Sequence, residues 1–283
     1  MRNFANHARE IIMVKNTTIY ILLLLVLLPL KEYNAQQYDG TPCFFTYQKM
    51  TKSQIEDIRK YYDRNIAKIT LSKSYSEIYP NVYQAWSSSI LRPDGKPPIK
   101  KTKIEVSGYG TENIFNPKYV QWSCMYSAYS LADKNTNTAW SEGLEGDGIG
   151  EFVIAQVNIK DPIKIWAGFG KNAKLFNQNN RPKNIKISVL VSTCGSDAID
   201  SEVRSNFHHI GDFSLVLKDI NNFQPLVVPQ SIIEKFLDSF DEEKFSYPED
   251  CSIKNMNSFI KITILSVYKG SKFSDTFITE ISN

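Results

Sequence analysis

The sequence predicts an all-β protein, an antiparallel β-sandwich preceded by a short helical N-terminal segment. Three observations support this prediction. From residue 104 onward, short runs alternate apolar and polar residues with a period of two, as half-buried strands do. Turn residues separate these runs, and the number of runs predicts about eight strands. The strand–helix–strand rhythm of a parallel sheet does not occur.

Length and charge limit the classes of partner. The chain has 283 residues, enough for one large or two small domains with their own cores. Its formal net charge is +3, and no block of Lys and Arg has the length or one-sidedness of a phosphate-binding patch. We therefore expect no nucleic-acid partner.

Residues 1–36 have the pattern of a secretory signal peptide. Basic residues precede an apolar run over 19–30, which ends at Lys31. That run is too short to span a bilayer core, which takes about 20 residues. We expect cleavage near Ala35, no transmembrane span in the mature chain, and a protein that is secreted or held at the cell surface or in the periplasm. An uncleaved signal anchor is the alternative.

Residues 37–103 are predicted to form a helical segment and a linker. Apolar residues recur there at steps of three and four, which indicates a helix with one apolar stripe. The stripe consists of Ile55, Ile58, Tyr62, Ile66 and Ile69. Ser53 and Glu56 form a capping box at its start. We expect the stripe to pack on the sandwich, with an interaction surface as the alternative, and the turn-rich stretch 87–98 to be a linker.

Residues 104–283 carry most of the predicted strands. The runs are 104–106, 152–159, 163–169, 185–191, 213–217, 224–228, 260–264 and 276–281. One helix is predicted at 231–241, because its apolar residues share one face.

Export would permit disulfides between the four cysteines. These are Cys43, Cys124, Cys194 and Cys251. Four cysteines allow three connectivities, and the absence of CxxC spacing disfavours a zinc ribbon. We expect Cys194 to pair with Cys251, because both lie in predicted loops that flank strands. Free buried thiols are the alternative.

The densest polar stretch is 131–152. Asp133 and Asn135 follow the spacing that begins an EF-hand loop. Thr138 and Leu144 stand where that loop needs a glycine and a carboxylate, which excludes an EF-hand. A calcium site of another kind is compatible with the many carboxylate, amide and hydroxyl oxygens of this stretch.

The glycines of the same stretch do not form a nucleotide-binding loop. Glu151 stands where the last glycine of that fingerprint should be, and a strand rather than a helix follows. We expect these glycines to adopt positive φ in a tight loop and Trp140 to lie in the core.

No catalytic constellation is visible. The sequence lacks a Ser/His/Asp set, a nucleophile elbow and the HExxH motif. Paired carboxylates such as Glu142 and Glu145 are expected to be solvated or metal-bound rather than catalytic. Adjacent histidines such as His208 and His209 would point to opposite faces of a strand, so they make a poor metal pair. We expect both to lie in a solvated loop. We therefore expect no enzymatic activity.

The polar loop 176–183 ends in basic residues. Amide side chains and an Arg guanidinium suit sugar hydroxyls or acidic groups, although any exposed loop contains such residues.

Four segments carry a family resemblance. They are DKNTNTAWSEGLEGDGIGEF at 133–152, IKIWAGFGKN at 163–172, FNQNNRPKNIKI at 176–187 and ITILSVYKGSKFSDTFITEI at 262–281. In this order they resemble a discoidin-type domain (F5/8 type C, a galactose-binding-like jelly roll). More narrowly, they resemble the variant that accompanies streptococcal NAD glycohydrolase as its translocation domain. The resemblance covers about residues 104–283.

The resemblance implies a binding domain, since the family's hydrolase is a separate domain. Relatives hold a structural calcium ion in the loop that matches 133–139, with a carboxylate from the last strand. This implies Asp133, Asn135, Thr138 and Glu280 as metal ligands, with Lys134 as a departure from the pattern.

We therefore expect an exported, non-enzymatic binding protein that recognises carbohydrate or another cell-surface ligand through loops at one end of the sandwich. Lys171, Asn180 and Arg181 are the candidate ligand-binding residues. One alternative is a docking or translocation partner of an exported enzyme. Another is a hydrolase with its site between the N-terminal segment and the sandwich.

Overall fold

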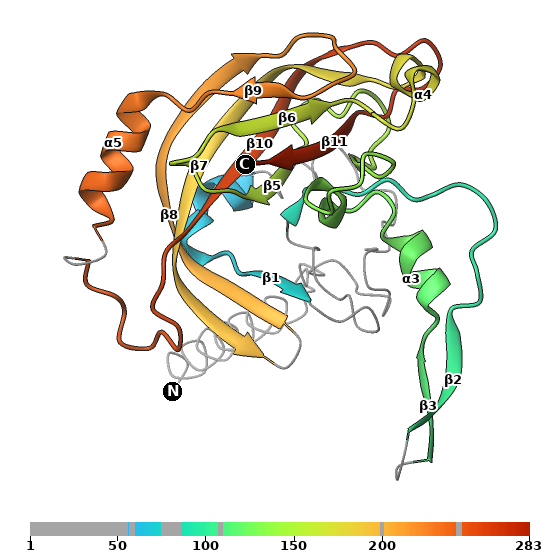
Figure 1. Cartoon of the computed structure of the whole chain (residues 1–283), viewed down its shortest axis with the longest axis horizontal. Helices are drawn as coiled ribbons and strands as arrows, with labels where there is room; N and C mark the ends of the chain where they lie inside the picture. Colours follow the sequence, from blue (N-terminus) through green and yellow to red (C-terminus); the bar gives the residue numbers. More distant parts are fainter. Residues whose placement is uncertain (1–55, 57–59, 75–85, 107–109, 199–200, 242–244) are drawn as a thin grey trace, which may run out of the picture. The chain divides into compact units, whose positions relative to one another are not determined.

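Two antiparallel sheets form the body of the protein in a computed structural model (Figure 1). The structure describes residues 56, 60–74, 86–106, 110–198, 201–241 and 245–283. All of them belong to one unit, residues 38–283. The predicted signal peptide, most of the capping box and Cys43 lie outside the described residues.

The larger sheet has five strands in the order β1-β8-β7-β10-β5, and the smaller has four in the order β4-β11-β6-β9. The first sheet comprises β1 (Leu71–Ser74), β8 (Ser201–Val216), β7 (Arg181–Ala198), β10 (Asn257–Tyr268) and β5 (Phe152–Gln156). The second comprises β4 (Trp140–Ser141), β11 (Phe277–Ser282), β6 (Ile163–Ala167) and β9 (Gln224–Leu226). The predicted antiparallel β-sandwich is confirmed.

The core lies where apolar residues of both sheets meet. Ile187 and Ile262 from the larger sheet and Ile165 and Ile278 from the smaller are all fully buried in one cluster. Each such side chain contributes about 1.5–3 kcal/mol of hydrophobic free energy. Trp140 is also fully buried, as predicted.

The described part of the N-terminal helical segment predicted at 37–103, which we call the leading segment, packs on the larger sheet and adds a strand to it. Residues 60–64 are helical and are followed by the 3₁₀ helix η1 (Ile66–Lys68). The Tyr62 ring lies against Phe152 with 4.8 Å between centroids, and Ile66 and Ile69 join the same core. The described part of the predicted apolar stripe therefore faces the sandwich, while Ile55 and Ile58 lie outside the described residues. Strand β1 then pairs with β8, a pairing that the sequence did not predict.

A separate hairpin precedes the sandwich strands. Strands β2 (Lys101–Val106) and β3 (Gly110–Phe115) pair only with each other among the described residues (Figure 1). The run predicted at 104–106 is therefore a strand, but it does not belong to the sandwich. Helix α3 (Pro117–Ser123) follows, capped by the Asn116 side chain, which accepts a hydrogen bond from Lys118 N at 3.0 Å.

Three further helical elements connect the strands. They are η3 (Ala128–Leu131), α4 (Ala173–Gln178) and α5 (Gln230–Ser239). Helix α5 confirms the helix predicted at 231–241 and buries Ile232 and Phe236. None of the helices in the described part of the chain is long and apolar enough to span a membrane.

The predicted disulfide between Cys194 and Cys251 is present, and Cys124 is disulfide-bonded as well. Cys194 lies within β7 and not in a loop, because β7 and β8 are much longer than the alternating runs suggested. The same extension places His208 and His209 in the middle of β8, so the expected solvated loop was wrong.

Candidate ligand site at the loop end of the sandwich

Three connections meet at one end of the sandwich, which we call the loop end. They are residues 142–151 between β4 and β5, 168–180 between β6 and β7, and 269–276 between β10 and β11. Thr276 Oγ1 donates a hydrogen bond to Asp147 O at 2.7 Å, which joins the first and third connections. Side chains that are far apart in the sequence therefore share one surface.

Asn180 joins the second connection to the other two. Its Nδ2 donates to Asp147 Oδ1 at 3.0 Å and to Ser274 O at 2.7 Å, and its Oδ1 accepts from Gly270 N at 2.7 Å. The side chain is 1% exposed. Asn180 thus fixes the shape of the loop end from within.

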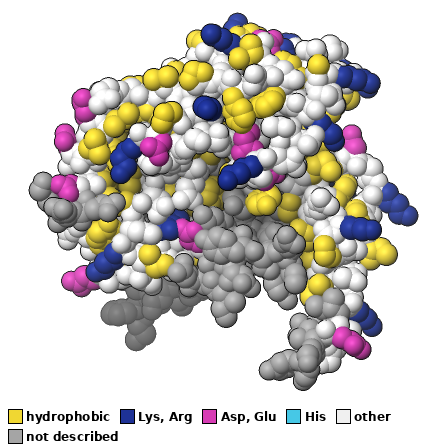
Figure 2. Space-filling model, in the orientation of Figure 1, with side chains coloured by type: hydrophobic (Ala, Val, Ile, Leu, Met, Phe, Trp, Pro, Cys, Tyr) yellow, Lys and Arg dark blue, Asp and Glu magenta, His cyan; other side chains and the backbone are white. Residues whose placement is uncertain are grey.

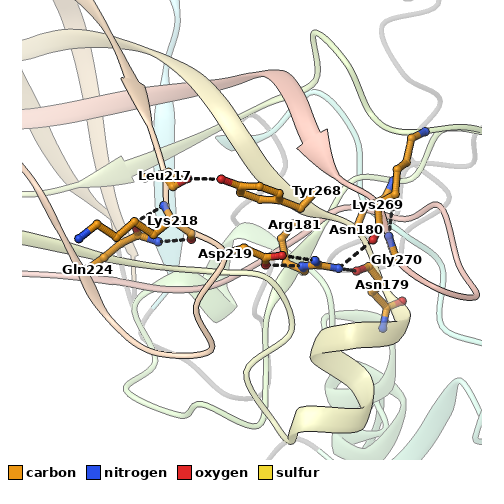
Figure 3. Close-up of polar contacts among 10 residues, drawn as sticks. All are labelled: Asn179, Asn180, Arg181, Leu217, Lys218, Asp219, Gln224, Tyr268, Lys269 and Gly270. Atoms are coloured by element: carbon orange, nitrogen blue, oxygen red, sulfur yellow. Dashed lines mark hydrogen bonds and ion pairs between the residues drawn. The ribbon is translucent and has the colours of Figure 1, made fainter.

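Arg181, the residue after Asn180, fastens the loop-end connections to Asp219 (Figure 3). Its guanidinium donates to both carboxylate oxygens of Asp219, at 2.9 and 2.6 Å. Nη1 donates to the carbonyls of Asn179 and Lys269, at 3.0 and 3.1 Å. The guanidinium also lies 5.1 Å from the Phe176 ring centroid. This bidentate, nearly buried arrangement uses the geometry that distinguishes Arg from Lys.

The predicted ligand-binding residues therefore separate into two groups. Asn180 and Arg181 point into the protein, and their polar atoms have protein partners, which gives both a structural role. Lys171 is exposed in the turn before α4. Direct contact with a ligand stays a prediction, and of the three side chains only that of Lys171 is placed to make it.

A small pocket of about 220 Å³ opens at the loop end. It is lined by Asp147, Asn180 and residues 269–274. Phe273 is 39% exposed there, and Lys272 Nζ lies 4.7 Å from its ring centroid. An exposed aromatic ring beside polar and cationic groups can bind a sugar ring or a protein side chain.

The charges of this pocket are paired. Asp147 forms an ion pair with Lys269, and the Lys269 ammonium together with the Asn180 amide holds the Asp147 pKa below its usual value. The aspartate is therefore ionised at neutral pH and cannot serve as a general acid there.

Asp133, Asn135 and Thr138 lie together in one tight turn before β4. Asn135 N donates to Asp133 Oδ1 at 2.8 Å, while Thr138 Oγ1 approaches Asp133 Oδ2 at 2.7 Å and Asn135 O at 2.6 Å. Lys134 adopts a positive φ of 60° inside this turn. The strained residue and the converging oxygens define a compact polar loop.

Glu280, on β11, faces this loop. Its side chain is 3% exposed, and its Oε2 has no hydrogen-bond partner. Burial and then the Asp133 charge raise the Glu280 pKa to about 7, against the opposing effect of the Lys134 and Asn135 backbone amides. The structure thus brings the four predicted metal-ligating residues into one neighbourhood.

Of the paired carboxylates Glu142 and Glu145, Glu145 is exposed as expected, whereas Glu142 is buried, contrary to the expectation. Glu142 and Glu151 are both fully buried. Glu142 accepts from Leu144 N at 2.9 Å and Thr276 N at 3.1 Å, while Glu151 accepts from Ser88 Oγ at 2.7 Å. These buried carboxyl groups hold the loop to its neighbours and are closed to a substrate.

The two histidines of β8 lie in different surroundings. His209 Nε2 lies 2.9 Å from Asp212 Oδ1 at the surface. His208 instead contacts the rings of Phe240 and Phe245, and burial lowers its pKa. Among the described residues, no group of three or more His, Cys, Asp and Glu side chains is arranged to hold a metal.

A cavity of about 640 Å³ lies along β5, away from the loop end. Its described lining includes Trp86, Gln156, Phe236 and Met256, and contains no Asp, Glu or His. A hydrolytic site between the leading segment and the sandwich would need such groups to converge here.

Sequence reasoning missed the residues that shape the loop-end pocket. Lys269, Lys272 and Phe273 lie in the short loop YKGSKFSD, whose signal was a Gly/Ser turn carrying basic and aromatic residues between two strands. Their proximity to Asp147 follows only from the sheet topology.

Comparison with solved structures gives only remote similarities. A mycobacterial arabinofuranosyltransferase, AftD, matches over 56% of this chain and 9% of its own, at 9% identity and a TM-score of 0.28. A Ruminococcus gnavus GH29 fucosidase in complex with fucose matches over 56% of this chain and 22% of its own, at 10% identity and a TM-score of 0.25. No curated protein matches the sequence.

Comparison with protein families matches residues 117–283 to the NAD glycohydrolase translocation F5/8 type C domain. The match covers all the sandwich strands except β1, together with the loop end and the Asp133–Glu280 neighbourhood. It confirms the discoidin-like resemblance, and the family is a translocation domain rather than a catalytic one. The chain therefore belongs to the NAD glycohydrolase translocation F5/8 type C domain family.

Proposed function

We propose that this chain is an exported, non-enzymatic docking module that attaches to a cell-surface ligand through its loop end and serves the translocation of an exported enzyme. The family match over 117–283 carries the proposal, because that family is named for translocation. Export itself rests on the predicted signal peptide.

The loop-end geometry supports a docking role. Asn180 and Arg181 hold the loop-end connections in place through buried hydrogen bonds. Binding through Lys272 and Phe273 would therefore lose little conformational entropy from ordering these loops. Half-exposed aromatic and cationic side chains on a rigid support are typical binding anchors.

Carbohydrate is a second candidate ligand. The observation that favours it is the loop-end pocket itself, in which the Phe273 ring adjoins the Asp147–Lys269 pair. A pyranose ring binds by stacking on an aromatic ring while its hydroxyls pair with polar groups of this kind.

We also propose a structural calcium ion between the 133–138 loop and β11. The partnerless Oε2 of Glu280 and the repulsion between the Glu280 and Asp133 carboxylates favour it, because a hard cation would satisfy both. Asp133 and Glu280 would supply charged oxygens, with Thr138 and Asn135 as further oxygen donors. The ion would neutralise the loop and tie it to the last strand.

Thermal unfolding with calcium and with EGTA tests this site. Calcium at 100 times its dissociation constant should stabilise the wild type by about 2.7 kcal/mol, and Glu280→Gln should lose that response. An equal response in the variant, or no response in the wild type, would refute it.

Flow cytometry of the fluorescently labelled mature protein on cultured epithelial cells tests docking. Saturable binding is expected, together with no release of nicotinamide from NAD⁺ by the same preparation. A glycan array then separates a carbohydrate ligand from a protein ligand. Hydrolysis of NAD⁺, or the absence of saturable binding, would contradict the proposed function.

A further inference from the structure

The net positive charge of the protein is concentrated in residues 92–106 and 110–118, which we call the basic arm. This segment contains six Lys or Arg residues and three Asp or Glu residues, a net charge of +3 that equals the formal net charge of the whole chain. Figure 2 shows Lys and Arg side chains on this part of the surface, at the lower right. Outside the arm and the predicted signal peptide, residues 1–36, the chain has 23 Lys or Arg and 25 Asp or Glu residues, a net charge of −2. The arm is therefore the place where an anionic partner gains most.

The arm is built on a two-stranded hairpin. Strands β2 and β3 pair over six residues each, from Lys101↔Phe115 to Val106↔Gly110, and no third strand joins them among the described residues. In such a ribbon, alternate backbone N–H and C=O groups of each strand point away from the partner strand. Lys101 and Lys103 are both exposed on β2.

The base of the hairpin is held in register. Asn116 N donates to Lys100 O at 3.1 Å, and the Phe115 ring stacks on Tyr119 of α3 with 6.5 Å between centroids. Lys101 Nζ also lies 5.7 Å from the Phe115 ring centroid. These contacts stabilise a ribbon that would be marginal alone, and they leave its edges preformed.

We propose that the basic arm is a docking site for an extended acidic segment of a partner protein, which adds to the hairpin as a third strand. The edge supplies backbone hydrogen bonds, and Lys101 and Lys103 select for carboxylates. A lipid surface would leave the backbone edge unused. A second copy of the chain would bring two basic arms together, which repel each other.

This site goes beyond the proposed function. The two hairpin strands, residues 101–106 and 110–115, lie outside the family match at 117–283, and none of these residues lines the loop-end pocket. The two surfaces can therefore be disabled separately.

Fluorescence anisotropy with a labelled decapeptide of alternating Glu and Val tests the proposal on the mature chain. The peptide should bind the wild type, and Lys101→Glu with Lys103→Glu should weaken binding by about tenfold or more. The matched variant Lys164→Glu with Lys218→Glu reverses two exposed lysines outside the arm and should bind as the wild type does. Circular dichroism confirms that both variants fold.

Two further probes identify the binding mode. The same peptide N-methylated at alternate residues should not bind, because it cannot pair with a strand edge. Phe273→Ala, which alters the loop end, should bind the unmodified peptide normally. Equal binding of the methylated peptide, equal binding by the charge-reversed arm, or arm-dependent binding to phosphatidylserine vesicles without peptide binding would each overturn the proposal.

Discussion

The Lys261 ammonium on β10 lies 2.6 Å from the Asp63 carboxylate of the leading helical segment. Lys261 is 5% exposed and also lies over the Phe152 ring, at 4.6 Å from its centroid. This ion pair and the Tyr62–Phe152 contact fasten the leading segment to the outer face of the larger sheet.

Asp63→Asn should therefore destabilise the protein, because it leaves a buried ammonium without its anion. We expect a loss of about 1–2 kcal/mol, less than for a fully buried pair because Asp63 itself is largely exposed. Glu56→Gln, which breaks the exposed Glu56–Lys60 pair, should change stability by less than about 0.5 kcal/mol. Urea unfolding measures both, and equal effects would contradict the assigned role of Asp63.

Removing the disulfide between Cys194 and Cys251 should lower the free energy of unfolding by more than Asp63→Asn does. Cys194 and Cys251 are 57 residues apart in the chain, and the bond closes that loop in the unfolded state. Replacing both by Ala should lower the free energy of unfolding by about 2–5 kcal/mol. If non-reducing peptide mapping finds Cys194 joined to another cysteine, the pairing itself is wrong.

Stability should fall as the pH rises, through Glu142. Burial raises its pKa to about 8 from the ordinary 4.5, helped by the charges of Glu151 and Asp275 and opposed by two backbone amides. The folded state thus binds the proton more tightly, so the contribution is complete below pH 4.5 and is lost as the pH rises through about 8. We expect a loss of about 4 kcal/mol between about pH 5 and pH 9.

Chemical unfolding of Glu142→Gln across this pH range is the check. The variant should show a flatter profile and retain a residual slope from Glu280, whose pKa is raised to about 7. A profile identical to that of the wild type would contradict the assignment to Glu142.

Arg181→Lys should lower stability by about 2–3 kcal/mol, because a lysine cannot pair with both oxygens of Asp219 and also reach two carbonyls. Lys171→Ala should leave the melting temperature unchanged, since that side chain is exposed. Differential scanning fluorimetry compares them. An Arg181→Lys protein with unchanged stability and impaired ligand binding would contradict the structural role and identify Arg181 as a ligand-binding residue.

The sequence predicted those parts of the fold whose signals are local. Period-two alternation identified β5, β6, β7 and β10, and the apolar face identified α5. Strand β1 was not predicted, because Leu71–Ser74 has no such pattern and becomes a strand only by pairing with β8. The hairpin was assigned to the sandwich because alternation cannot tell which sheet a strand joins.

The candidate sites show the same limit. Resemblance placed Asp133 and Glu280 in one predicted metal site, and in the structure the Asp133 charge acts on Glu280 from across the domain. The loop-end residues could not be sorted into exposed and buried, because the partner of Arg181 is Asp219, which lies 38 residues away in another loop. Only the three-dimensional structure shows that Arg181 faces inward and Phe273 outward.

Attachment through the loop end is most directly tested by the apparent dissociation constant of labelled protein on cells. Phe273→Ala should raise that constant by about tenfold, because it removes the exposed aromatic anchor. Val227→Ala, which truncates a 66% exposed apolar residue outside the loop end, should leave it unchanged. Unaltered binding by Phe273→Ala would contradict the account.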